Sequence, residues 1–163
     1  MTLDEVNASD RAGFIERVGW VFEHSPWVAE RAWTRKPFRS LDELHAELTA
    51  QMAAASPDEQ LSLLRAHPDL GARIKMSDAS TNEQASAGLD SLTSEEFERL
   101  RRLNAAYRDR FGFPFLYAVK GSTKHDILKA LEARLPSSRE QELAEALRQV
   151  ARIARFRLEE LIS

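Results

Sequence analysis

The sequence has no cysteine, which excludes disulfide bridges, thiolate metal sites and cysteine nucleophiles. It has no apolar run near the ~18 residues that a membrane span needs, and no basic stripe that would bind nucleic acid. No apolar signal core follows Asp4 and Glu5, so we expect a cytoplasmic protein without a secretory leader. The 163 residues and the net charge of −3 fit one domain, 1–163, that buries its core without metal.

Signals for helix starts are frequent along the chain. Four times a serine or threonine precedes a glutamate by three residues, as in a capping box: Ser40/Glu43, Ser56/Glu59, Thr93/Glu96 and Ser137/Glu140. Apolar residues then recur every three or four positions, whereas the one candidate strand, 115–119, is short and isolated. The pattern predicts an all-α bundle of about eight helices, at 10–23, 27–34, 41–54, 57–66, 81–87, 94–110, 124–135 and 138–161.

His67 lies at the predicted end of the helix 57–66. Pro68 disfavours helical backbone at the residue before it, so the helix should stop there. Imidazole titrates near neutral pH and could exchange a proton with a ligand, although the position equally suits a charge at a helix C-terminus. The other three histidines lack the spacing of metal ligands, so we expect no metal site.

A polar segment follows in the connection 67–80 and the helix after it, and consists of Ser80, Thr81, Asn82, Glu83 and Gln84. Thr81 could cap this helix, with Glu83 in the first turn against the positive helix end. The N–H groups of the helix start, with the Glu83 carboxylate and the Gln84 amide, could equally grip a small anion or heterocycle.

Arg157 falls on the inward face of the last helix, since Ile153 and Leu161 lie four residues to either side. A buried arginine needs an anionic partner, which could be a carboxylate of the protein or a ligand. Asn104 lies on an apolar stripe in the same way, and we expect it to bond to backbone. In the connection 111–123, glycine and proline shape a rigid aromatic loop whose backbone groups could read a flat heterocycle.

Together these segments resemble the family of 2-oxo-4-hydroxy-4-carboxy-5-ureidoimidazoline (OHCU) decarboxylases of urate breakdown. The matching stretches follow in the family's order from residue 14 onward: His67-Pro68-Asp69-Leu70; Ser80-Thr81 with Glu83-Gln84; Ala87-Gly88-Leu89-Asp90; Leu103-Asn104 with Tyr107; Phe111-Gly112-Phe113-Pro114-Phe115 with Ala118-Val119-Lys120-Gly121; Ile127-Leu128; Arg134-Leu135; and Arg152-Ile153-Ala154 with Arg157-Leu158.

The resemblance implies an all-helical enzyme, commonly a homodimer, that needs neither metal nor organic cofactor and converts OHCU to (S)-allantoin and carbon dioxide. It implies His67 as the catalytic acid and Glu83 as its carboxylate partner. The chain's ending, Leu161-Ile162-Ser163, is no peroxisomal signal and favours a bacterial-type cytoplasmic enzyme. The implied substrate contacts are Pro68, Ser80, Thr81, Asn82, Gln84, Phe115, Leu116, Tyr117, Ala118, Val119 and Arg157.

Two other classes of protein compete with this interpretation. A non-catalytic helical interaction module would fit the caps and the apolar stripes equally well, but it would not need His67, Glu83 and Arg157 around one pocket. A cofactor-free hydrolase acting on a related ureide could use His67 and Glu83 to activate water. The products distinguish these activities, because a hydrolase releases ammonia or a cleaved urea instead of carbon dioxide.

Overall fold

A computed structural model describes residues 1–71 and 78–163, which form two compact parts. The first comprises Met1–Ala66 with Val150–Ser163, and the second comprises His67–Gln149. The described residues contain helices and connecting segments without a strand, which confirms the all-α prediction. None of the helices they form is long and apolar enough to cross a bilayer.

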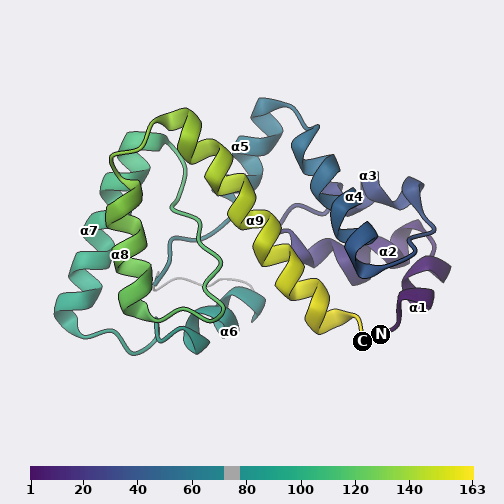
Figure 1. Cartoon of the computed structure of the whole chain (residues 1–163), viewed down its shortest axis with the longest axis horizontal. Coiled ribbons are helices and arrows are strands. Elements are labelled where there is room, and N and C mark those ends of the chain that lie inside the picture. Colours follow the sequence, from purple (N-terminus) through teal and green to yellow (C-terminus); the bar gives the residue numbers. More distant parts are fainter. Residues whose placement is uncertain (72–77) are drawn as a thin grey trace. The chain divides into compact units, whose positions relative to one another are not determined.

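The first part is built from short helices around an apolar core. Its α3 packs against α2 and against α4. The rings of Phe14 and Phe38 stack with centroids 6.0 Å apart, and Leu44 and Leu48 have no exposed surface. The helices of this part are α1 (Leu3–Ala8), α2 (Arg11–Val18), α3 (Trp27–Ala32), α4 (Leu41–Ala53), α5 (Pro57–Arg65) and the later turns of α9 (Arg139–Leu161), all labelled in Figure 1.

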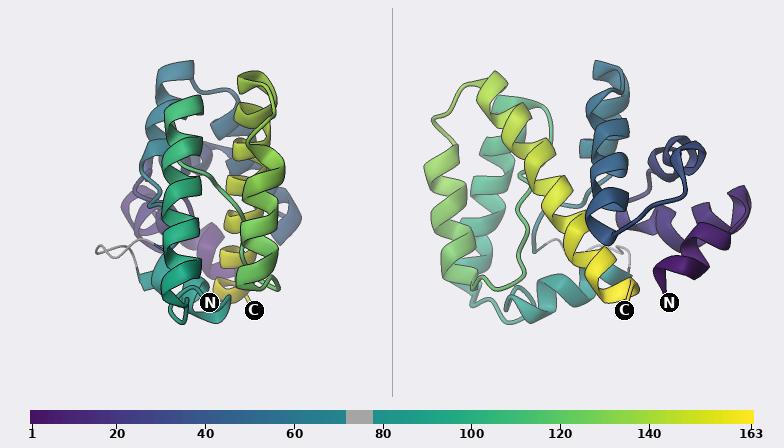
Figure 2. Two further views of the ribbon diagram at one scale, coloured as in Figure 1. Left: turned by 90° about the vertical axis from the view of Figure 1, so that its left-hand side faces the viewer. Right: turned by 45° about the vertical axis from the view of Figure 1, so that its right-hand side comes forward.

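The second part contains α6 (Asp78–Ser86), α7 (Ser94–Phe111), α8 (Lys124–Arg134) and the first turns of α9. Helices α7 and α8 pack side by side. The segment 112–123 returns along their length, so the two helices run in the same direction (Figures 1 and 2). A long return without regular structure is thus held inside this part.

An aromatic cluster fills the space between α7 and the returning segment. The ring of Tyr107 lies 4.5 Å from that of Phe111, 6.1 Å from Phe113 and 5.4 Å from Phe115, measured between centroids. All four side chains are buried. The aromatic residues of the loop therefore pack as core, and they fix the backbone that carries them.

The helix bounds follow the predicted ones closely where a proline or a cap marks them. Ser56 and Thr93 form reciprocal capping boxes with the glutamates three residues on, as predicted, and Ser40 accepts the N–H of Glu43. The predicted helix 10–23 is shorter, because α2 gives way to a 3-10 turn at Gly19–Val21.

Helix α2 begins one residue late, at Arg11 after the N-cap Asp10, and three further helix starts differ from the prediction. Helix α9 begins one residue late, since Ser138 and Gln141 exchange the capping bonds predicted for Ser137 and Glu140, and glutamine serves the reciprocal bond as well as glutamate. Helix α1 was not predicted, although Thr2 caps it. Helix α6 begins at residue 78 instead of 81, and residues 72–77 of the predicted connection lie outside the described residues.

Candidate active site

His67 follows directly on the end of α5. The helix ends at Arg65 with Ala66 as its C-cap, where Pro68 predicted a stop. The His67 side chain is buried, with 6% of its surface exposed, and Pro68 is half-buried. A titratable ring is thus held in a mostly enclosed position by backbone that proline restricts.

Gly71 closes the loop after His67 in a conformation that favours glycine. Its φ is +72°, and a Cβ at this position would lie 2.5 Å from Cδ2 of Leu100 on α7. The Gly71 N–H donates to Oε1 of Gln84 on α6 at 2.8 Å. The predicted substrate contact Gln84 therefore uses its carbonyl oxygen to fix the loop that carries His67.

Two further contacts anchor the same loop to α7. Nδ2 of Asn104 donates to the carbonyl of Leu70 at 3.0 Å, which confirms that this buried asparagine bonds to backbone. A guanidinium nitrogen of Arg108 lies 3.1 Å from Oδ1 of Asp69. Three successive residues of the loop are therefore held by the helices of the second part.

The polar segment lies within α6 and is divided between two faces. Ser80, Glu83 and Gln84 follow helical spacing on one face, where Ser80 and Gln84 are buried and Glu83 is half-buried. Thr81 and Asn82 are exposed. The predicted cap at Thr81 is wrong, because no proline or glycine stops the helix from extending back to residue 78.

The Gly71–Gln84 hydrogen bond relates the predicted catalytic residues to each other. It joins the backbone four residues after His67 to the side chain next to Glu83 on α6. The loop of His67 and the helix of Glu83 are therefore tied together inside one compact part.

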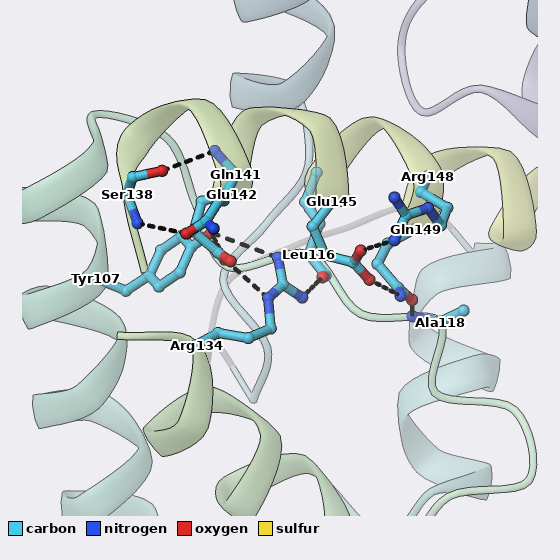
Figure 3. Close-up of polar contacts among 10 residues, drawn as sticks. All are labelled: Tyr107, Leu116, Ala118, Arg134, Ser138, Gln141, Glu142, Glu145, Arg148 and Gln149. Carbon is cyan, nitrogen blue, oxygen red and sulfur yellow. Dashed lines mark hydrogen bonds and ion pairs between the residues drawn. The ribbon is translucent and has the colours of Figure 1, made fainter. Parts of the chain in front are cut away.

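The predicted contact segment 115–119 has neither helical nor strand structure. Its side chains are buried except that of Tyr117, which is half-buried and lies with its hydroxyl 3.2 Å from Oγ of Ser122. Two of its backbone groups bond to side chains: the carbonyl of Leu116 accepts from Arg134 at 2.7 Å, and the N–H of Ala118 donates to Gln149 at 2.9 Å (Figure 3).

A buried polar network lies behind this segment. Oε1 of Glu142 accepts from the Tyr107 hydroxyl at 2.6 Å and from Nε of Arg134 at 2.7 Å (Figure 3). Burial, followed by the bond to Glu142, raises the pKa of Tyr107 well above its usual range. Sequence reasoning missed Glu142 and Gln149, because α9 has many polar residues and no local signal marks these two as buried.

Arg157 lies in the first compact part, and its side chain is 3% exposed, as its inward position predicted. A guanidinium nitrogen lies 3.0 Å from Oε2 of the equally buried Glu23. Another donates to the carbonyls of Trp20 and Val21 at 3.3 and 3.4 Å. Of the two partners that the sequence left open, the protein carboxylate is present. The sequence signal for this partner is an acidic residue, Glu23, directly after the apolar Val21 and Phe22.

Comparisons with known proteins give one family. Residues 7–159 match the family described as OHCU decarboxylase. The 2-oxo-4-hydroxy-4-carboxy-5-ureidoimidazoline decarboxylase of Haloferax volcanii is 49% identical over 100% of this chain and 97% of its own length. The uric acid degradation bifunctional protein PucL of Bacillus subtilis is 48% identical over 99% of this chain, which spans only 33% of that protein. A crystal structure of (S)-allantoin synthase aligns with a TM-score of 0.83 and 36% identity, over 99% of this chain and 54% of the other.

Proposed function

Because this chain belongs to the OHCU decarboxylase family, we propose that it decarboxylates OHCU to (S)-allantoin without a cofactor, with His67 as the general acid. The observation that carries the proposal is the family match along residues 7–159. A relative with this activity in its name is 49% identical and is covered over 97% of its length. The chain corresponds to one third of the bifunctional relative, so the proposal is limited to the decarboxylation.

The reaction needs little from the protein beyond a proton and a fixed orientation. The bond between the ring carbon and the carboxylate breaks, and carbon dioxide leaves. The electron pair of the broken bond passes into the imine and carbonyl groups of the substrate itself. A proton must then reach carbon from one face to give a single enantiomer. General acid–base catalysis of this kind contributes ~10²–10⁴-fold, and positioning supplies the remainder.

The structure supports His67 and Glu83 in these roles. His67 is buried and follows a helix end, and its loop is held by Gln84 next to Glu83. In the proposed mechanism the Glu83 carboxylate stabilises the protonated imidazole, so that the ring can act as the acid. Such a fixed donor can deliver its proton to one face of the substrate.

The remaining features implied by the family are part of the same proposal. The segment 115–119, Pro68, Ser80, Gln84 and Arg157 are substrate contacts, and the exposed Thr81 and Asn82 are the weakest of these candidates. One functional domain over 1–163 is supported by the near-complete family match. A homodimer and a cytoplasmic location are further predictions.

The test is a coupled assay that starts from urate, with urate oxidase and hydroxyisourate hydrolase present. The wild-type chain should speed the loss of the intermediate and yield optically active allantoin, followed by absorbance and circular dichroism. Loss at the spontaneous rate to racemic allantoin would contradict the decarboxylase. Release of ammonia or a cleaved urea would instead indicate the hydrolase.

His67→Asn tests the acid. We expect kcat to fall ~10²–10⁴-fold, since asparagine keeps a polar side chain, smaller than that of histidine, but has no titratable proton. The matched control is His125→Asn, at a histidine whose side chain is 75% exposed. Normal kcat in His67→Asn, with unchanged unfolding, would remove His67 from the mechanism.

A further inference from the structure

We propose that Arg134 and Gln149 are positioning residues, which hold the backbone of the segment 115–119 in the geometry that the substrate contacts. The inference rests on the proposed function, which makes that backbone part of the substrate site. Neither residue needs to touch the substrate. Each acts through one backbone group of the segment, Arg134 through the carbonyl of Leu116 and Gln149 through the N–H of Ala118.

The two bonds act on one edge of the segment. In an extended chain, residues two positions apart direct their N–H and C=O groups to the same side, and the residue between them directs its own to the other side. Leu116 and Ala118 are two apart, and side chains of α8 and α9 bond them as a neighbouring strand would. With Leu116 and Ala118 held by the protein, the proposal assigns contact with the ligand to the backbone groups of Tyr117 between them.

Other contacts fix the Arg134 side chain in addition to its bond to Leu116. Its Nε donates to Glu142 at 2.7 Å, and its guanidinium lies 4.5 Å from the ring centroid of Phe115. The Tyr107 hydroxyl bonds the same Glu142 oxygen at 2.6 Å. Charge-assisted bonds in such a buried site are short and strong, so they leave the guanidinium one orientation. Its Nη1, which donates to the Leu116 carbonyl at 2.7 Å, then determines where that carbonyl lies.

Gln149 is oriented by a second contact on α9. Its Nε2 donates to Oε1 of Glu145 at 2.8 Å, so its Oε1 is the oxygen that faces the Ala118 N–H (Figure 3). Glu145 is paired in turn with Arg148. The segment is therefore clamped by two side chains whose own directions are set by carboxylates.

The decisive variants are Arg134→Lys and Gln149→Met, which keep most of the side-chain volume but lose the directed bond. Loss of one such bond corresponds to about a tenfold change in an equilibrium constant. We therefore expect KM for OHCU to rise about tenfold in each variant, with kcat changed less. A variant that was merely less stable would lose active enzyme, and therefore kcat, with KM unchanged. Hydrogen exchange of the peptide 115–119, measured by mass spectrometry, should accelerate in both variants.

The matched control is Arg99→Lys. Arg99 forms an ion pair with Glu132 between α7 and α8, and its side chain is 42% exposed. We expect its KM and the exchange of peptide 115–119 to match the wild type. Should Arg134→Lys fail to fold, Gln149→Met decides the question on its own.

A rescue by exchange of the pair separates position from stability. In Glu145→Gln/Gln149→Glu the carboxylate can accept from both the Ala118 N–H and the new amide, so KM should return to within about threefold of the wild type. If the wild type is active and KM in Arg134→Lys and Gln149→Met equals that of Arg99→Lys, the positioning role alone is overturned. An inactive wild type would overturn the proposed function, and the positioning role with it.

Discussion

Glu23 and Arg157 show how a single charged residue can have two interpretations until its partner is known. The guanidinium of Arg157 is enclosed by a carboxylate and two backbone carbonyls of its own chain. These contacts account for its burial without a ligand, so its role in substrate binding has to be tested apart from its role in folding. The loop that carries His67 is fixed by contacts of Gly71, Leu70 and Asp69 with other residues.

The first prediction concerns this buried pair. Glu23→Ala should lower the free energy of unfolding by about 3–5 kcal/mol, because removal of one partner leaves a buried charge uncompensated. Urea unfolding measures it. The control is Glu30→Ala, which breaks the exposed pair with Arg11 and should cost little. Equal effects in both variants would show that the Glu23–Arg157 pair is not the source of stability.

At the scale of elements, the loop after α5 depends on how closely it approaches α7. Gly71→Ala should be destabilising for two reasons: the left-handed φ costs about 1–2 kcal/mol, and the new Cβ would overlap Leu100. Because the loop carries His67, kcat should fall as well. Stability from urea unfolding and kcat from the coupled assay check both effects.

Gly121→Ala is the matched control for this substitution. Gly121 has a similar φ of +80°, but nothing lies within 4 Å of the Cβ that would be added. It should show the backbone cost without the contact with Leu100 and without the loss of kcat. If both variants lost the same stability and kept kcat, close approach to α7 would play no part in holding His67.

Elements with local signals could be predicted from the sequence, and those that depend on distant partners could not. Pro68, Ser56 and Thr93 act on their own backbone, so the end of α5 and the starts of α5 and α7 were predictable. The start of α6 has no such mark, and the prediction placed it too late. The partners of Gln84 and Arg134 are set by packing between helices, which periodicity predicts only as burial.

At the scale of the whole molecule, acid stability depends on carboxylates in both compact parts. The bond to Arg31 lowers the pKa of Glu59 to about 2, and the bond to Lys124 lowers that of Glu96 to about 2, each from 4.5. A carboxyl with a lowered pKa stabilises the fold above its unfolded pKa, and this contribution is lost as the pH falls toward the folded value.

The third prediction follows from this direction of the pH dependence of stability. The stability of the wild type should fall between about pH 4.5 and pH 2. Glu96→Gln should flatten this acid limb, because the amide cannot take up the proton. Thermal unfolding across pH 2–7 measures it, with Glu140→Gln, at an exposed glutamate, as the control. An unchanged slope in Glu96→Gln would contradict the assignment.

The hydroxyl of Tyr107 gives the molecule an optical reporter of its own. The chain has two tyrosines, so Tyr107 accounts for half of the tyrosinate absorbance that alkali can produce. Burial and the bond to Glu142 raise the pKa of Tyr107, so its hydroxyl stays protonated at a pH where an exposed tyrosine has ionised. The tyrosinate absorbance of Tyr107 therefore appears only when the contacts among α7, α8 and α9 open. An alkaline titration thus reports, without any label, whether these contacts are intact.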